Sequence, residues 1–432
     1  MHRVDEPVTT PDEDAPVDTS AAELALPSTV VATSLGDYVR ARLVRLRSGE
    51  AGVIPVFVGM ILIAIIFQSL NSKFLTSENL VNLLVQGSVF MLLAMAEVFV
   101  LLLGEIDLSA GFVAGLSGVV VAELLTSAHG GWPWWAAILI ALLITAGIGL
   151  LQGSLVTRIG LPSFVVTLAG LLGWQGVMLA ILGNGGTVSI QDKTVNDLAN
   201  ANLTPVVSWI VVIALVAVYA VMTLRKDQRR RASGLVAPPL SFTIAKVAGV
   251  AVAGVVIVLI CNANRGVLVP IKGMPWVFLI VLGVVTVWTI LLGRTKFGRH
   301  VYAIGGNAEA ARRAGISLAR VRTICFVLAS FTAGIAGIVY ASRLRSVSTN
   351  LDGGTLVLYA VAAAVIGGTS LFGGRGKAIH AVLGGIVIAS IDNGMGLQGF
   401  SAASRNIVTA IVLIAAVTID ALARRANSAT AR

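Results

Sequence analysis

The stretch that decides the fold is GEIDLSAGFVAGLSGVVVA, residues 104–122, which directly follows another apolar run. Its first residues place two carboxylates, Glu105 and Asp107, between apolar segments. Charged side chains are costly in hydrocarbon, and a broken helix at membrane depth is tolerated where it lines protein or a water-filled cavity. We therefore predict a helix that breaks at Gly104 and restarts at Asp107 or Ser109.

The residue types in this stretch suit such a break. Glycine allows the conformations and the close packing that a break requires. Aspartate and serine are good N-caps, because their side-chain oxygens accept the exposed amide protons of the next turn. Two roles stay open for Asp107 and Ser109, namely capping alone or contact with a transported substrate. The residues assigned to the broken helix are Gly104, Glu105, Asp107, Leu108, Ser109 and Gly111.

The composition is that of an integral membrane protein. Of the 432 residues 56% are hydrophobic and 12% are charged, whereas soluble domains carry about 25% charged residues. The two cysteines lie in apolar stretches and the four histidines are scattered, so we predict neither a disulfide framework nor a metal site. The net charge of +10 is explained by basic residues beside the apolar runs, so no nucleic-acid partner is expected.

Twelve apolar runs are candidate membrane spans. Lipid cannot satisfy backbone polar groups, so each run is expected to be a helix. The predicted fold is all-α, a polytopic transmembrane bundle of about twelve spans. Ten full spans plus broken helices is the alternative, because 108–126 and 355–372 are short or interrupted by glycine. The runs lie near residues 53–70, 80–103, 108–126, 133–152, 162–182, 205–224, 241–262, 275–292, 321–341, 355–372, 378–397 and 405–422.

Three regions are expected along the chain. Residues 1–50 are rich in proline and acidic residues, which predicts a disordered arm. The transmembrane domain is expected over 51–424 with a long basic loop at 293–320, and a short tail is expected over 425–432. Most of the 31 lysines and arginines fall on the side of the N-terminus, so the positive-inside rule predicts that arm, loop, tail and both termini are cytoplasmic.

The basic loop contains GGNAEAARRAG, residues 305–315. We predict a turn at 305–307, an N-cap at Asn307, and a short surface helix that ends near Gly315. Glu309 falls in the first turn, where a carboxylate complements the helix dipole. The helix could dock into a protein or lie on anionic lipid. Its alanines offer a small smooth surface without tryptophan, phenylalanine or leucine, which favours docking.

Two of these motifs resemble those of one protein family. GEIDLSAG is similar to the glycine-glycine-isoleucine-aspartate-leucine-serine signature of permease subunits in ABC importers of monosaccharides, with Glu105 where the second glycine usually stands. FGRHVYAIGGNAEAARRAGI, residues 297–316, resembles the coupling loop of the same permeases. The likeness runs from about residue 55 to 422, and the extra helical pair in 205–262 resembles the xylose-type branch.

The resemblance implies a multi-pass permease subunit in the bacterial inner membrane, which is not an enzyme and binds no cofactor. The implied substrate is a pentose or hexose, similar to xylose. Implied partners are a second permease copy, an ABC ATPase subunit that binds ATP and Mg, a periplasmic or lipid-anchored sugar-binding protein, and membrane lipid. The residues implied in coupling to the ATPase are Gly305, Gly306, Asn307, Glu309, Ala310, Ala311, Arg312 and Gly315.

Polar and aromatic residues inside the apolar runs are candidates for the substrate pathway, although hydrogen bonds between helices are the alternative role for each polar one. The candidates are Asp107, Phe164, Thr167, Trp174, Asp392 and Asn393. The competing function is an autonomous secondary transporter driven by protons. Its carboxylate relay would consist of Glu97, Glu105, Asp107 and Asp392.

Overall fold

The computed structural model describes residues 54–183, 186–233 and 238–430, so the predicted arm over 1–50 lies outside the described residues. The described part is helical apart from two short strands and the connecting loops. The helices are α2 (Ile54–Leu70), α3 (Ser77–Leu101), α4 (Ala110–Leu125), α5 (Trp134–Ser154), α6 (Ser163–Leu182), α7 (Lys193–Asn200), α8 (Pro205–Ala232), α9 (Leu240–Asn262), α10 (Val277–Arg294), α11 (Lys296–Gly306), α12 (Ala308–Arg313), α13 (Leu318–Leu344), α14 (Gly353–Ile366), α15 (Ala378–Leu397) and α16 (Ala402–Thr430). A 3₁₀ turn, η1 (Ser127–His129), follows α4, and a π-helical turn, η2 (Leu155–Ile159), follows α5.

Each of the twelve apolar runs forms a helix, which confirms the all-α class. Within the described residues, eight helices are long and apolar enough to cross a membrane. Four apolar helices are shorter, among them α4 and α14, whose runs the sequence marked as short or broken. Among the described residues the structure therefore shows eight long candidate spans plus four shorter apolar helices, which supports a polytopic bundle.

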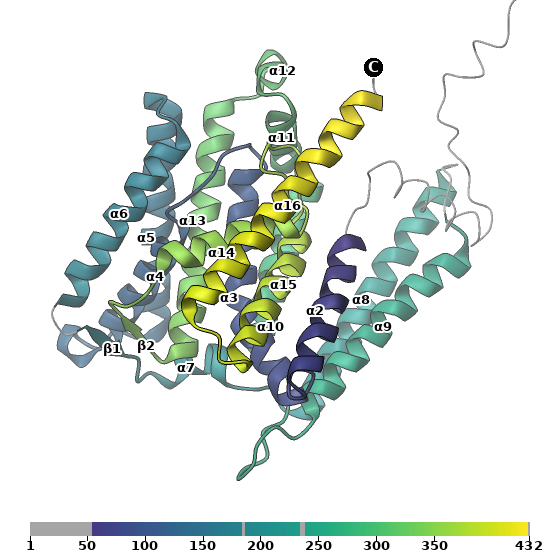
Figure 1. The fold of residues 1–432 in the computed structure, drawn as a ribbon. Coiled ribbons are helices and arrows are strands. Elements are labelled where there is room, and N and C mark those ends of the chain that lie inside the picture. The colour runs from purple at the N-terminus through teal and green to yellow at the C-terminus, as the bar shows by residue number, and fades with distance from the viewer. Residues whose placement is uncertain (1–53, 184–185, 234–237, 431–432) are drawn as a thin grey trace, which may run out of the picture.

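Helix α3 is the centre of the bundle. Its residues from Gly87 to Leu101 are buried, because α13, α15, α14 and α10 pack around it. Helices α4 and α5 pack on the other side of α13 (Figure 1). Small residues allow close packing there: a Cβ added to Gly337 of α13 would lie 1.8 Å from the carbonyl oxygen of Ala114 in α4. Such close backbone approach is typical of membrane helix interfaces.

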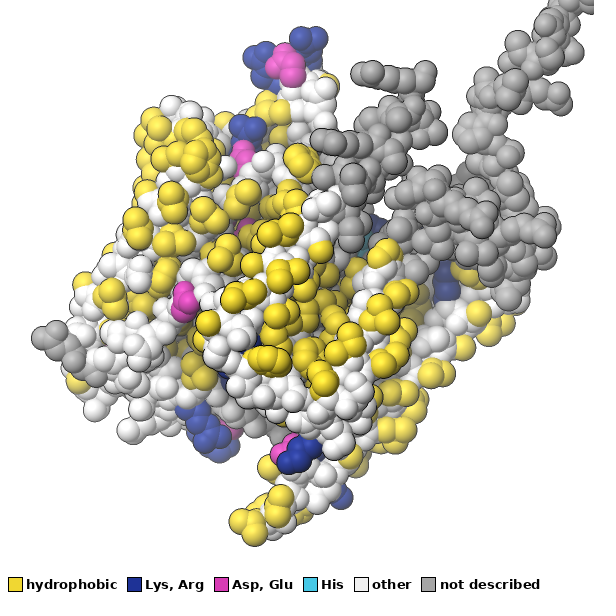
Figure 2. All heavy atoms as spheres, in the orientation of Figure 1, with side chains coloured by type: hydrophobic (Ala, Val, Ile, Leu, Met, Phe, Trp, Pro, Cys, Tyr) yellow, Lys and Arg dark blue, Asp and Glu magenta, His cyan; other side chains and the backbone are white. Residues whose placement is uncertain are grey.

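Helices α8 and α9 form a pair at the edge of the bundle (Figure 1), which confirms the predicted extra helical pair. Both are largely exposed along their apolar lengths. Figure 2 shows hydrophobic side chains spread over much of the visible surface of the bundle. A surface of this kind is suited to contact with lipid chains.

The two ends of the bundle differ. The short helix α12 projects at one end, which we call the α12 end, and both the beginning of α2 and the end of α16 lie toward it (Figure 1). Helix α7 and the strands β1 (Thr187–Ser189) and β2 (Ser346–Ser348) lie at the opposite end, called here the far end. The strands pair antiparallel, with Val188 opposite Val347.

Candidate functional site

The predicted helix break lies between α3 and α4. Helix α3 ends at Leu101, and α4 begins at Ala110 with Ser109 as its N-cap residue. Asp107 Oδ1 accepts hydrogen bonds from the Ser109 backbone N–H at 2.9 Å and from the Ser109 hydroxyl at 2.6 Å. The expectation that Ser109 caps α4 through its side chain is wrong. Its hydroxyl donates to Asp107 and accepts from Gln152 Nε2 at 2.8 Å, which fixes the break against α5.

A second carboxylate lies beside the break. Glu97 in α3 is fully buried and interacts electrostatically with Asp107. The backbone N–H of Asp107 also faces the Glu97 carboxyl, and Asp107 Oδ2 has no hydrogen-bond partner among the described residues. The sequence placed both residues in apolar surroundings but did not indicate that they lie side by side.

Glu105 finds a partner that is distant in sequence. Arg322, in the second turn of α13, places its Nε 3.0 Å from Glu105 Oε1. The Glu105 side chain is 10% exposed and the Arg322 side chain 32% exposed. The pair neutralises the carboxylate that the local sequence left without a counter-charge, and it joins the broken helix to the helix that follows α12.

A cavity of about 470 Å³ opens beside this ion pair at the α12 end. Glu105 and Arg322 form part of its wall, together with the η2 turn, the start of α6 at Ser163 and the start of α13 at Leu318. Pockets for small molecules are typically about 300–1,000 Å³, so this cavity is large enough for one. Motif analysis of the sequence missed it, because its wall is assembled from three separated segments.

The short helices α4 and α14 meet at their first turns. A Cβ on Gly111 would lie 1.9 Å from the carbonyl oxygen of Gly353, and a Cβ on Gly353 would lie 2.7 Å from the ring of Phe112. Asp352 caps α14 by accepting a hydrogen bond from Thr355 N at 3.0 Å. Gly111 is therefore required for close packing between the first turns of α4 and α14.

We expect Gly111→Ala to destabilise the protein by about 1–3 kcal/mol, because the new methyl group must displace backbone. The matched control is Gly147→Ala in α5, where a Cβ meets nothing within 4 Å. The midpoint of thermal unfolding of the purified protein in detergent measures both. Equal midpoints for the two variants would contradict the close contact at Gly111.

The basic loop predicted over 293–320 contains two helices. Its first part, 296–306, is α11, where the sequence predicts a loop with a turn at Gly305 and Gly306. That turn is wrong, because both glycines are helical and only Asn307 is extended. A Cβ on Gly305 would lie 1.8 Å from the carbonyl oxygen of Leu102 and 2.5 Å from Gly374 N, so Gly305 provides close packing against the broken-helix loop.

Helix α12 agrees with the predicted short helix. Asn307 caps it by accepting a hydrogen bond from Ala310 N at 2.9 Å. Ala311 is buried, whereas Ala310 is exposed. Gly315 follows with φ +81°, a left-handed conformation that suits glycine at a helix end.

The charged residues of α12 form a surface ion-pair network. Glu309 accepts hydrogen bonds from Arg312 and Arg313, with distances between 2.9 and 3.1 Å. These hydrogen bonds hold the pKa of the Glu309 carboxyl below its ordinary value. All three side chains remain largely exposed, so α12 presents a compact charged and alanine-rich surface at the end of the bundle.

The six predicted pathway residues do not form one site. Thr167 is buried near the break and donates to the carbonyl of Ile106 at 3.2 Å. Phe164 is 56% exposed on the surface of α6, so within the described part of the chain it does not line an internal path. Asn393 accepts a hydrogen bond from Asn79 Nδ2 at 2.8 Å, which is a contact between helices. Trp174 is partly buried, and its Nε1 has no hydrogen-bond partner in the described part of the chain.

Asp392 belongs to a polar group in the far half of the bundle. Its oxygens accept from Gln86 Nε2 at 2.5 Å and from Arg405 at 3.3 Å. Tyr340 and Arg343 near the end of α13 also interact with Asp392 electrostatically. This group brings together side chains of α3, α13, α15 and α16, of which the sequence analysis selected Asp392 alone.

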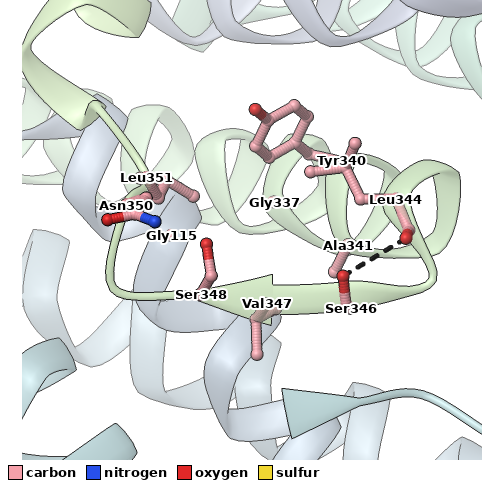
Figure 3. A pocket seen from close by; sticks show the side chains of 11 residues that line it. Gly115, Gly337, Tyr340, Ala341, Leu344, Ser346, Val347, Ser348, Asn350 and Leu351 are labelled. Atoms are coloured by element: carbon pink, nitrogen blue, oxygen red, sulfur yellow. Dashed lines mark hydrogen bonds between the residues drawn. The ribbon is translucent and has the colours of Figure 1, made fainter. Parts of the chain in front are cut away.

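A small pocket lies next to that group, between Gly115 of α4, the end of α13 and strand β2 (Figure 3). The side chains of Ser346 and Ser348 point to one side of β2 and that of Val347 to the other (Figure 3), and all three residues line the pocket. Its volume of about 70 Å³ suits a few waters, since one water needs about 10–15 Å³ by this measure. Among the described residues, no group of three or more histidine, cysteine, aspartate or glutamate side chains is arranged to hold a metal ion.

The chain is similar to known transport proteins over most of its length. Residues 79–417 match the family described as branched-chain amino acid transport system / permease component. The chain is 34% identical to the xylose transport system permease protein of Escherichia coli K12, over 88% of this chain and 94% of that protein. It is 30% identical to the D-allose transport system permease protein of the same strain, over 84% and 89%. It is also 30% identical to the ribose import permease protein of Bacillus subtilis, over 84% and 91%. No solved structure matches the chain.

Proposed function

The chain belongs to the family of ABC transporter permeases that serve carbohydrate uptake, and on that premise we propose that it moves a monosaccharide with energy from a partner ATPase. It is a multi-pass protein of the bacterial inner membrane. As a permease subunit it is not itself an enzyme and has no cofactor, because the partner ATPase handles ATP. The proposed substrate is a pentose or hexose, with D-xylose first among the candidates. The proposal rests on the similarity to the xylose permease over most of both chains.

The contact at Gly305 is the observation that carries the proposed mechanism. Helix α12 is exposed and capped, and it connects through α11 to a backbone contact with Leu102 in the broken-helix loop. After α12 the chain enters α13, whose Arg322 pairs with Glu105 in the same loop. A displacement of α12 by an ATPase is therefore transmitted to the broken helix from two sides.

We assign the α12 end to the cytoplasm. The first and last described helices begin and end toward that end (Figure 1), and the positive-inside rule predicts that both termini are cytoplasmic. On this assignment we expect the arm over 1–50 and the tail over 425–432 on the cytoplasmic side. A second copy of the chain completes the pathway, the ATPase docks on α12, and a sugar-binding protein delivers substrate at the far end, where Asp392, Gln86 and Arg405 form a polar group.

In this mechanism the permease is a two-state element that ATP biases. ATP-driven closure of the ATPase subunits moves α12 and opens the pathway toward the binding protein. Sugar enters between the two copies, and hydrolysis returns the helices to the state open to the cytoplasm. The permease contributes weak hydrogen bonds and packing but no covalent chemistry.

A proton-coupled secondary transporter has little support. Glu97 and Asp107 lie together at the break, but Glu105 is paired with Arg322, and Asp392 is paired with Arg405 in a separate group. The four carboxylates therefore do not form one relay. Membership of the ABC permease family also argues for ATP as the energy source.

The test is uptake by the reconstituted complex. The permease, its ATPase and its binding protein are placed in proteoliposomes, and uptake of D-xylose, D-ribose, D-allose and leucine is measured with ATP enclosed. We expect ATP-dependent uptake of D-xylose or another of the sugars, and no uptake of leucine. Uptake by the permease alone under a pH gradient would overturn the proposal, as would leucine uptake without sugar uptake.

We expect Asp392→Asn to lower sugar uptake about tenfold, because it removes a charged acceptor shared by Gln86 and Arg405 and leaves Arg405 unpaired. The control is Asp197→Asn in α7, which breaks an exposed pair with Lys193. Uptake rates of the reconstituted variants, normalised to the amount of assembled complex, measure the effect. Equal rates for both variants would contradict a pathway role for Asp392.

A further inference from the structure

We propose that the cavity beside Glu105 and Arg322 is a binding site for a neutral monosaccharide at the cytoplasmic end of the pathway, where sugar pauses before release. The inference rests on the proposed function and specifies a site within it. The cavity measures about 470 Å³ and combines an ion pair with uncharged walls. This volume falls within the usual range for small-molecule pockets, about 300–1,000 Å³.

The charges in the wall favour a neutral polyhydroxyl ligand over an anion. Glu105 and Arg322 are the charged residues among those that line the cavity, and they are paired at 3.0 Å, so their charges cancel. A lipid phosphate would meet the Glu105 carboxylate as well as the guanidinium. Sugar hydroxyls, by contrast, can donate to a carboxylate and accept from a guanidinium in one site.

Glu105 has free hydrogen-bonding capacity at this position. Its side chain is nine-tenths buried, and Oε2 has no hydrogen-bond partner among the described residues, although the residue lines the cavity. A buried carboxylate oxygen without a partner is costly. Oε2 is closed off from solvent, so a ligand hydroxyl would satisfy it once the Glu105 side chain turns toward the cavity that the residue lines. Apolar side chains such as Leu161 and Leu318 in the same wall suit the C–H face of a sugar ring.

The position of the cavity links its occupancy to the ATPase. Part of the wall is the first turns of α13, which begins shortly after α12 ends. Another part includes Val156 and Thr157 of η2, a π-helical turn, and such turns are frequent at functional sites. A displacement of α12 moves Leu318 and the Glu105–Arg322 pair relative to Thr157 and Ser163 in the rest of the wall, so the same motion that resets the transporter weakens the site and releases the sugar.

Protection from chemical labelling tests the site. Ser163 lines the cavity and is replaced by cysteine in the assembled complex, where the native Cys261 and Cys325 are buried. At a D-xylose concentration of twice the dissociation constant we expect maleimide labelling to slow about threefold, since the free fraction of sites falls as 1 + [L]/Kd. L-xylose serves as the osmotic control, and Ser241→Cys, exposed at the start of α9, as the position control.

Two further variants separate a binding role from a structural one. Glu105→Gln is expected to raise the half-protecting D-xylose concentration about tenfold, because a charge-assisted hydrogen bond is lost. Leu161→Trp adds bulk to the cavity wall at a residue outside the ion pair. It should abolish protection by D-xylose while the ATPase still binds the permease.

Three results would overturn the site: no protection in the wild-type background, equal protection by L-xylose, or full protection in the Leu161→Trp variant. Labelling that slows with anionic lipid content and not with D-xylose would assign the cavity to lipid instead. An error in the proposed binding site can be told apart from an error in the proposed function, because the uptake measurement uses neither the labelling nor these variants. Normal sugar uptake without protection overturns the site alone.

Discussion

Gly305→Ala is expected to abolish sugar uptake and to destabilise the permease. The added Cβ would lie 1.8 Å from the carbonyl oxygen of Leu102 in the broken-helix loop and 2.5 Å from Gly374 N in the loop between α14 and α15. These two backbone segments are joined by a hydrogen bond from Gly374 N to Leu102 O, so neither yields without moving the other. Overpacking of this kind costs about 1–3 kcal/mol, and here it also displaces α11 from the loop that it contacts. Uptake in proteoliposomes and the midpoint of thermal unfolding measure the two effects.

Gly306→Ala is the matched control for this prediction. Gly306 is the next residue in the same helix, but a Cβ there meets nothing within 4 Å. It should leave uptake and the unfolding midpoint unchanged, or raise the midpoint slightly, since alanine favours a helix over glycine. If the two variants behave alike, the close contact between α11 and the broken helix is not what couples them.

Ala310→Trp is expected to uncouple the permease from its ATPase while leaving the permease folded. Ala310 is exposed on α12, so a large side chain finds space in the isolated subunit. The same side chain would prevent a small alanine-rich helix from entering a groove of matching shape on the partner. We expect co-purification of the ATPase, and ATP hydrolysis stimulated by the sugar-loaded binding protein, to fall to background.

Ala402→Trp at the start of α16 is the control, because that position is exposed and α16 begins toward the far end of the bundle (Figure 1). The unfolding midpoints of both variants should match the wild type. ATPase binding that survives in Ala310→Trp would show that α12 lies outside the docking surface. Lipid binding by α12, the alternative drawn from the sequence, would then be the better interpretation.

The sequence predicted the features that depend on local signals. All twelve apolar runs are helical, because a membrane segment has to satisfy its own backbone hydrogen bonds. Helix α12 was predicted with its N-cap because Asn307, Glu309 and Gly315 carry the capping and termination signals within one short stretch. The break at GEIDLSAG was predicted for the same reason.

Features that depend on tertiary structure were missed. The sequence predicts a loop where the structure has α11, because Gly305 and Gly306 suggest a turn. The packing of Gly305 against Leu102 and Gly374 is not visible in the sequence. The pairing of Glu105 with Arg322 joins segments that are far apart in sequence, and no local pattern signals it. Phe164 was selected as an aromatic residue in an apolar run, but its position on the exposed face of α6 becomes visible only once the helices are packed.

The central claim is that a separate ATPase binds α12 and, by displacing it, moves the transmembrane helices. The most direct test replaces the six residues of α12, Ala308–Arg313, by a glycine-serine linker of equal length and measures ATP-driven sugar uptake by the reconstituted complex. We predict that the variant inserts into the membrane and pairs with a second copy but loses ATPase binding and sugar uptake. Uptake at the wild-type rate would contradict the account.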